Sequence, residues 1–404
     1  MRIHPFQGLV PPPARAPEVA CVPYDVVDAA EAAALAAGRS GSLLHVDRAE
    51  INLPAGTNPY SDAVYAKARE NFLGLQQSGC LIPESGPCLY LYQLRMGEHV
   101  QRGIVAACAV EDYEQDRIKR HEKTRQDKED DRSRLIDTLD AQTGPVLLAY
   151  RDTPAIANLV GRLVSEVPQH DFTAPDGIRH TLWRIPGGEE WVKVFAEVPA
   201  AYIADGHHRV ASAARVARQR RERNPGHTGD EEYNWFLAVL FPAGELKILP
   251  YNRIVADLNG IEPADFLTRV REHFRLDEEA PDAPEAPGRI SMYFQGRWYG
   301  LRCTADPSAD PVGRLDVSLL QERLLAPVLG IADVRTSKRI DFVGGIRGPG
   351  ELVRRVDATG GVAFSMYPVS LDQLMAIADA GQIMPPKSTW FEPKLRSGLF
   401  VHTF

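Results

Sequence analysis

The chain has 404 residues, of which 44% are hydrophobic and 25% charged. This length and composition allow two or three globular domains with sizeable cores and exclude a wholly disordered chain. The formal net charge of −8 disfavours a nucleic-acid-binding protein, which usually carries a strongly basic domain, so we expect no nucleic-acid partner.

Cysteine usage and apolar run lengths indicate a cytoplasmic protein. The cysteines are scattered and form no C-x-x-C pair, so neither a disulfide framework nor a zinc site fits their spacing. The first residues lack the basic segment and apolar stretch of a signal peptide. No run of about 18 apolar residues occurs, so we expect no membrane partner.

Up to Pro250 the apolar patterning predicts helices and strands without a regular strand–helix–strand alternation. The charged stretch 111–140 contains no Gly or Pro and is interpreted as one or two exposed helices. We expect further helices at residues 29–37, 60–77, 155–164 and from His207 onward. We expect strands at residues 43–46, 88–94, 103–110, 146–150, 182–185, 191–195, 200–204 and 236–241.

After Pro250 the composition changes. The acidic, Pro-rich stretch 277–288 predicts a surface loop, and two short apolar runs around Gln295–Arg297 predict a hairpin. Further strands are expected at 340–343 and 363–366, with helices at 318–329, 351–356 and 371–380. Because no regular βαβ order emerges, we predict an α+β fold with domains at 1–250 and 251–404.

The strongest constellation is Asp205-Gly206-His207-His208-Arg209, directly after an apolar strand and at the start of a helix. The first N–H groups of a helix lack partners and its dipole favours an anion, while Gly206 lets a ligand approach the backbone. The alternative is an ordinary Asp N-cap with surface histidines. Adjacent histidines diverge on a helix, so we expect no metal held by these side chains.

A second constellation lies in the charged stretch. If it is helical, His121, Arg125, Lys128 and Arg132 fall within an arc of about 60° and form a basic stripe with Glu122 at its edge. Such a stripe beside a carboxylate suits a triphosphate and a base. The alternative is a solvated helix with ion pairs between successive turns.

Several segments resemble known families. The run YIADGHHRVASAA at 202–214 resembles the signature turn of the ParB/sulfiredoxin-like superfamily, in the form found in its free serine kinases. On other shared segments the chain is identified as a member of a bacterial domain family of unknown function. These segments are PYDVV at 23–27, RHEKT at 120–124 with Asp131 and Arg132 after it, DFVGG at 341–345 and MPPKSTWFEPKLRSGLF at 384–400.

The resemblance implies a ParB/sulfiredoxin-like mixed-sheet core with large insertions and a C-terminal α/β extension whose tail packs back on the site. It implies a kinase that transfers a phosphoryl group from ATP or ADP, with Mg²⁺, to the hydroxyl of free L-serine. In the compact kinases the base lies a few tens of residues before the turn, whereas Glu122 lies 83 residues before Asp205. The segment 146–197 would then be an insertion.

The site residues expected on this basis fall into three groups. The catalytic residues are Glu122, Asp205 and His208. The nucleotide-binding residues are Gly206, His207, His208, Arg209, Arg125 and Arg132, with Arg209 taken as an exposed residue at the helix start. The substrate-binding residues are His121, Lys387, Ser388 and Thr389.

Two other functions stay open on the sequence. One is a nucleotide-hydrolysing switch of the ParB type, against which the acidic charge argues. The other is a sulfiredoxin-like transfer, which needs a cysteine at the turn where this chain has His207 and His208. P-loop and protein-kinase motifs are absent. The sequence also leaves a homo-oligomer open.

Overall fold

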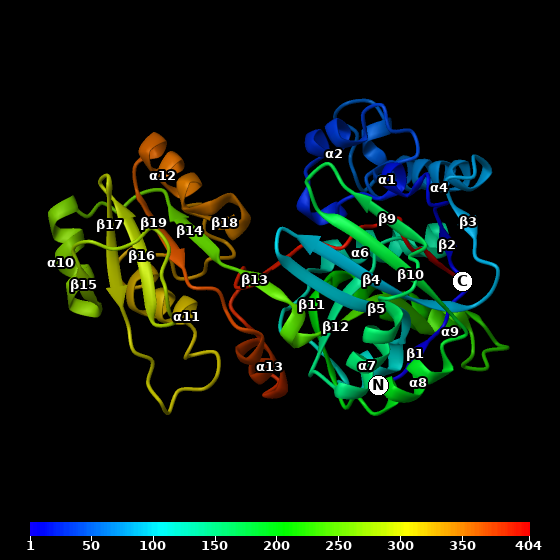
Figure 1. The fold of residues 1–404 in the computed structure, drawn as a ribbon. Helices are drawn as coiled ribbons and strands as arrows, with labels where there is room; N and C mark the ends of the chain where they lie inside the picture. The colour runs from blue at the N-terminus through cyan, green and yellow to red at the C-terminus, as the bar shows by residue number, and fades with distance from the viewer. The chain divides into compact units, whose positions relative to one another are not determined.

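The computed structural model describes residues 1–404, which fall into two compact units. Unit 1 comprises Met1–Leu246 together with the tail Pro393–Phe404, and unit 2 comprises Lys247–Glu392 (Figure 1). The tail therefore belongs with the first part of the chain, whereas the sequence analysis assigned it to the region 251–404. None of the helices has the length and apolar character needed to cross a membrane.

Unit 1 combines helices with a large sheet. Its helices are α1 (Ala16–Val19), α2 (Ala29–Ala36), α3 (Leu44–Asp47), α4 (Asp62–Gln77), α5 (Val110–Glu114), α6 (Gln126–Leu139), α7 (Pro154–Leu163), α8 (Glu189–Ala196) and α9 (His207–Arg223). Its strands are β1 (Ile3–His4), β2 (Leu9–Val10), β3 (Ile82–Pro83), β4 (Cys88–Met96), β5 (His99–Ala109), β6 (Ile118–Lys119), β7 (Ala141–Gln142), β8 (Val146–Tyr150), β9 (His170–Thr173), β10 (Arg179–Pro186), β11 (Ala201–Asp205), β12 (Trp235–Pro242) and β21 (His402–Thr403).

The main sheet of unit 1 is mixed. Its strands follow the order β6-β11-β8-β12-β5-β4-β10-β9, and β1 pairs with β5. The pairs β6–β11 and β8–β12 are parallel and the others are antiparallel. Because β8 lies between β11 and β12, the segment 146–150 is an internal strand of the sheet.

Two apolar clusters stabilise unit 1. The first joins the main sheet to α7, α8 and α9, with buried members such as Leu148, Phe195 and Val210. The second joins α2, α3 and α4 to α6 and includes Val401 of the tail. Each fully buried Leu, Val or Phe contributes roughly 1.5–3 kcal/mol, so both clusters fix the elements that surround β11.

Unit 2 contains a six-stranded antiparallel sheet in the order β15-β17-β16-β19-β14-β18 and a separate pair, β13–β20. The strands are β13 (Lys247–Leu249), β14 (Tyr251–Val255), β15 (Arg275–Asp277), β16 (Arg289–Phe294), β17 (Arg297–Arg302), β18 (Ile340–Gly344), β19 (Val362–Met366) and β20 (Trp390–Glu392). The helices are α10 (Pro263–His273), α11 (Asp316–Leu320), α12 (Gly348–Thr359) and α13 (Leu371–Asp379).

The predicted mixture of helices and sheet is confirmed, and three local predictions are wrong. Residues 43–46 form part of α3, because the short apolar run is a buried helical turn, which periodicity alone does not distinguish from a strand. Residues 191–195 lie in α8, whose buried Trp191 and Phe195 are one helical turn apart. The stretch 111–140 is α5, β6 and α6 in succession. The ParB/sulfiredoxin-like core stays a prediction.

Candidate functional site

The signature turn follows a bulge in β11. Ile203 faces Leu148 but Asp205 faces Leu147, so the strand shifts register just before the turn and re-aims the Asp205 side chain. Gly206 has φ 97°, and a Cβ there would lie 3.1 Å from Cζ and Nε of Arg209. Only glycine satisfies both the left-handed backbone and this close approach.

Arg209 is buried and contacts several groups around the turn, whereas we expected an exposed residue. It is 8% exposed, and its Nη2 lies 3.2 Å from Asp205 Oδ2 and 3.6 Å from Asp25 Oδ2. Its Nη1 donates to the carbonyl of Pro145, and its buried Nε has no acceptor. Burial alone would lower the pKa of Arg209, but the two carboxylates hold it above its ordinary value.

Asp205 is held in the charged form. Burial opposes ionisation, but Lys394 of the tail, whose Nζ lies 3.7 Å away, and Arg209 lower the pKa of Asp205 to about 2. A carboxylate with so low a pKa is a weak general base at neutral pH. The geometry therefore fits Asp205 better as a partner that orients two cations than as the group that accepts a substrate proton.

The two histidines of the turn tie the segment 120–125 to α9. The backbone N–H of His121 donates to Nε2 of His207 at 3.4 Å, and that of Arg125 donates to Nε2 of His208 at 3.1 Å. A neutral ring that accepts at Nε2 carries its proton on Nδ1, an assignment that follows from these bonds. Burial lowers the pKa of His207 and of His208, which favours the neutral rings that these two bonds require.

Glu122 lies beside the start of α9. Its Oε2 is 3.9 Å from Nδ1 of His207, and its side chain is 47% exposed. The parallel pairing of β6 with β11 explains this, because Ile118–Lys119 and Ala201–Tyr202 run side by side into their following segments. A carboxylate 83 residues before Asp205 is thereby brought to the turn.

The predicted basic stripe does not exist. His121 and Arg125 precede α6, so they share no helix face with the other two cations. Lys128 donates to the hydroxyl of Tyr60 on the surface. Arg132 is directed inward, where it pairs with Asp131 at 2.8 Å and stacks at 4.0 Å on the ring of Tyr24. The guanidinium of Arg125 pairs with Asp127 at 2.8 Å.

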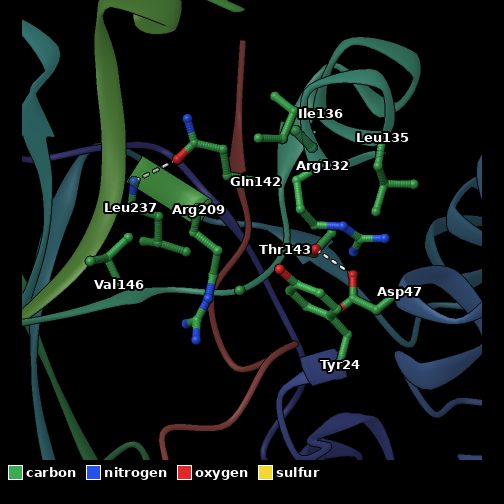
Figure 2. Close-up of a pocket in the computed structure, with 12 residues that line it drawn as sticks. Tyr24, Asp47, Arg132, Leu135, Ile136, Gln142, Thr143, Val146, Arg209 and Leu237 are labelled. Carbon is green, nitrogen blue, oxygen red and sulfur yellow. Dashed lines mark hydrogen bonds between the residues drawn. The ribbon is translucent and has the colours of Figure 1, made fainter. Parts of the chain in front are cut away.

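A small cavity lies behind the turn. Figure 2 shows Tyr24, Arg132 and Arg209 among the residues that line it, with Thr143 donating to Asp47 at 2.6 Å. Its volume of about 30 Å³ holds about two water molecules and cannot hold a nucleotide.

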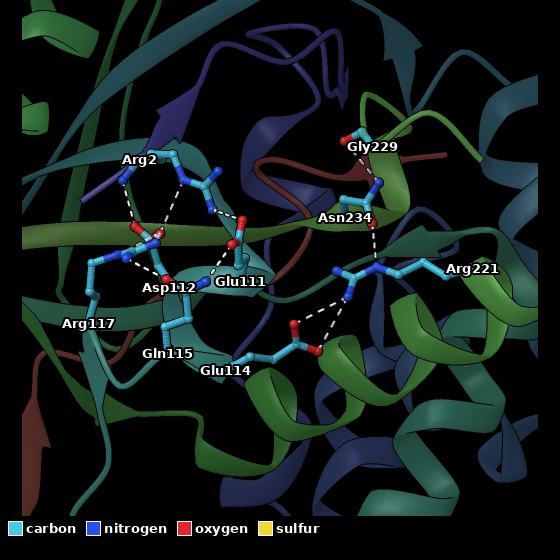
Figure 3. Close-up of polar contacts among 9 residues, drawn as sticks. All are labelled: Arg2, Glu111, Asp112, Glu114, Gln115, Arg117, Arg221, Gly229 and Asn234. Atoms are coloured by element: carbon cyan, nitrogen blue, oxygen red, sulfur yellow. Dashed lines mark hydrogen bonds and ion pairs between the residues drawn. The ribbon is translucent and has the colours of Figure 1, made fainter.

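A polar cluster fixes the segment that leads into β6. Buried Asp112 of α5 binds the backbone N–H of Arg2 and, at 2.6 Å, Nη2 of Arg117 (Figure 3). On α9, Arg221 binds Glu114 at 3.2 Å and Asn234 at 2.7 Å. These contacts join α5 to the N-terminal residue Arg2, to Arg117 just before β6, and to α9.

The sequence analysis missed several of these residues. Asp47 and Thr143 carry no motif signal, because only the fold brings them to the cavity. Asp25 lies in PYDVV and Lys394 in the tail motif, so the shared segments did point to them. Of the predicted substrate residues, His121 lies at the turn, whereas Lys387, Ser388 and Thr389 lie in unit 2.

No group of three or more His, Cys, Asp or Glu side chains could hold a metal ion. The carboxylates of Asp205, Asp25 and Asp131 are paired with Arg or Lys side chains. The residues present therefore do not fit a dedicated magnesium site.

A family model matches residues 3–318 of the chain and carries the description "Protein of unknown function (DUF1015)". The chain belongs to this family. The predicted membership of a domain family of unknown function is thereby confirmed, whereas the resemblance to ParB/sulfiredoxin-like proteins stays a prediction. No curated protein matches the chain.

Three solved structures show a weak similarity to the chain. A mutant free serine kinase in complex with ADP has a TM-score of 0.34 at 14% identity, covering 75% of this chain and 94% of that one. SbnI with a C-terminal truncation from Staphylococcus aureus has 0.37 at 14%, covering 74% and 87%. A conserved hypothetical protein from Pyrococcus furiosus has 0.33 at 14%, covering 74% and 95%.

The buried His121 makes stability depend on pH. Burial lowers the pKa of His121 to about 4 in the folded chain, from about 6.5 when unfolded. Since the unfolded chain binds the proton more tightly, the free energy of unfolding should fall as pH falls from 6.5 toward 4. Urea unfolding of wild type and His121→Gln at several pH values measures this slope. The slope should be smaller in His121→Gln and unchanged in the exposed control His273→Gln; equal slopes in all three chains would contradict it.

Proposed function

We propose that this chain is a phosphotransferase that moves a phosphoryl group from ATP or ADP to the hydroxyl of free L-serine, giving O-phosphoserine. The observation that carries the proposal is the position of Glu122, whose carboxylate lies 3.9 Å from His207 at the start of α9. A base and an anion-binding helix start thus lie side by side, as transfer from a nucleotide to an alcohol requires.

The nucleotide phosphates would bind at the turn. The first N–H groups of α9, at His207, His208 and Arg209, have no acceptor within the helix, and the helix dipole adds attraction. The Nδ1–H of His208 supplies a neutral donor. Lys394 of the tail lies beside Asp205 and would supply a positive charge to the phosphates.

Glu122 is the proposed general base. In the transfer, the bond between the terminal phosphorus and its bridging oxygen breaks, the serine oxygen bonds to phosphorus, and Glu122 takes the hydroxyl proton. Asp205 is excluded from this role because its pKa of about 2 makes it a poor acceptor. Its proposed task is to orient Arg209 and Lys394. His208 holds the backbone of Arg125 and thereby the segment that carries Glu122.

Magnesium has no dedicated protein site here, so in this proposal it would arrive on the nucleotide phosphates. Bound there, it supplies positive charge that offsets the charge of the transferred group. The proposed tasks of Arg132 and Arg125 are indirect: Arg132 stacks on Tyr24 behind the turn, and Arg125 contributes its backbone N–H. Lys387, Ser388 and Thr389 stay proposed substrate ligands in unit 2.

A substrate screen tests the proposal. The purified full chain is incubated with ATP or ADP, Mg²⁺ and single amino acids or small alcohols, and the products are followed by phosphorus NMR. A phosphomonoester that appears with L-serine and not with L-alanine supports the kinase. Nucleotide hydrolysis without a phosphorylated acceptor supports the switch function instead, and absence of both reactions and of nucleotide binding rejects the proposed role of the turn.

A further inference from the structure

Unit 2 contains a buried arginine without an acidic partner. Arg253 lies on β14, between β18 and β19, and is 3% exposed. Its Nη1 donates to the carbonyl of Tyr251 at 2.6 Å, and its Nη2 donates to the carbonyl of Lys387 at 3.3 Å. Its guanidinium also lies 5.5 Å from the ring centre of Phe342. None of these neighbours is a carboxylate.

This arrangement is costly for the unliganded protein. Burial lowers the pKa of Arg253 to about 10, and no carboxylate opposes that effect. Buried charges in proteins are normally paired, and an unpaired one destabilises the folded state. By contrast, buried Arg209 and Arg132 of unit 1 each have at least one carboxylate partner. Arg253 therefore differs from these two arginines in having no carboxylate partner.

Two of the shared sequence segments surround Arg253, namely DFVGG at 341–345 and the part of the tail motif that lies in unit 2. Neither has a role at the turn in unit 1. DFVGG ends β18, where a Cβ at Gly344 would lie 2.8 Å from the Trp390 ring and one at Gly345 would lie 2.6 Å from Pro250. Both glycines thus allow the chain around Tyr251 to close against the tail motif. Trp390 packs edge-on against Tyr251, with ring centres 5.3 Å apart.

Lys387 adds a second cation at the same place. It is exposed, its Nζ lies 5.5 Å from the centre of the Tyr251 ring, and its own carbonyl contacts Arg253. Its backbone has φ 56°, which is uncommon for a residue with a side chain. The buried guanidinium of Arg253 is therefore in direct contact with the backbone of an exposed residue.

We propose that Arg253, together with Lys387, forms an oxyanion-binding site in unit 2 that takes a carboxylate or phosphate group of a small ligand. A guanidinium has five N–H donors in a planar fork, and Arg253 uses only two of them on backbone carbonyls. The remaining donors match the two oxygens of a carboxylate or phosphate. In the proposed kinase these groups belong to L-serine and to the nucleotide, but the site stands on its own contacts.

Ligand-dependent stabilisation of the full chain tests this site. Thermal unfolding is followed in sodium phosphate, sodium acetate and L-serine, each against sodium chloride at equal ionic strength. Wild type should be stabilised by at least one oxyanion, with an apparent affinity that falls at least tenfold in Arg253→Lys, which keeps the charge but loses the fork. The exposed Arg297→Met on β17 is the matched control and should keep the wild-type affinity. Equal affinity in Arg253→Lys and wild type, or no stabilisation of wild type by any oxyanion, overturns the proposal.

A second variant separates this site from a merely structural arginine. Arg253→Met removes the unpaired charge, so without oxyanion it should unfold at the same temperature as wild type or higher, and it should lose the oxyanion effect. A lower unfolding temperature with the oxyanion effect intact would show a structural role and overturn the proposal. Stabilisation by phosphate alone assigns the site to phosphate groups, and stabilisation by acetate and L-serine assigns it to carboxylates.

The variant His208→Ala tests whether the oxyanion binds at the turn in unit 1 instead. The rise in unfolding temperature that oxyanions cause through Arg253 should be unchanged in His208→Ala. Loss of that rise in His208→Ala would place the oxyanion at the turn and overturn the site in unit 2. The assay needs no phosphoryl transfer, so failure of the kinase screen and failure of this site give different results.

Discussion

Glu122→Gln should lower kcat for serine phosphorylation by a factor of about 10²–10⁴, the usual contribution of a positioned general base. The amide keeps the size of the side chain but cannot accept the hydroxyl proton. Since the side chain is about half exposed, stability should change little. Phosphorus NMR of product formation and thermal unfolding of the same preparation measure the two effects separately.

The control for this variant is Glu222→Gln, an exposed position near the end of α9, which should keep wild-type kcat. Nucleotide affinity should be retained in Glu122→Gln, because the proposed phosphate contacts lie at the turn. Full activity in Glu122→Gln combined with loss of activity in Asp205→Asn would assign the base to Asp205 and contradict the role argued from its low pKa.

Arg209→Met should lower the free energy of unfolding by about 3–5 kcal/mol, the cost of breaking a buried ion pair from one side. The substitution leaves Asp205 and Asp25 without their shared guanidinium and removes a donor to the carbonyl of Pro145. Urea unfolding followed by circular dichroism measures the loss. The same variant should also lose nucleotide affinity, since the start of α9 is held by these contacts.

Arg125→Met is the matched control for stability. Its side chain is 71% exposed and pairs with Asp127 on the surface, where ion pairs contribute about 0–1 kcal/mol. A loss in Arg209→Met as small as that in Arg125→Met would mean that the buried pairs around the turn contribute nothing to folding. Such a result would agree with the expectation from the sequence that Arg209 binds nucleotide without stabilising the fold.

Local patterns predicted the elements around the turn well. The apolar run before Asp205 is β11 and the helix begins at His207, as expected from the strand, the glycine and the helix start. The hairpin predicted around Gln295–Arg297 is formed by β16 and β17. Such elements are predictable because burial period and turn residues are local properties of the chain.

The charged stretch shows where local patterns fail. A long run without Gly or Pro favours one helix, but Asp116 adopts φ 57° and β6 follows it, because β11 offers a parallel partner. The residues of the stretch alone do not predict the pairing of β6 with β11. The burial of Arg209 and the role of Asp47 were missed for the same reason, since Arg209 pairs with Asp25 and Asp47 accepts from Thr143, residues that lie far apart in the chain.

The tail has a consequence for synthesis on the ribosome. Val401 belongs to an apolar cluster of unit 1, β21 pairs with β7, and Lys394 contacts Asp205, but all of unit 2 is translated before these residues. Unit 2 has its complete sequence as soon as Glu392 has emerged, whereas unit 1 stays incomplete until the segment Pro393–Phe404 has emerged as well. A nascent chain interrupted before Pro393 would therefore expose an open apolar cluster and an Asp205 without its lysine, which marks it for chaperones and proteases and not for catalysis.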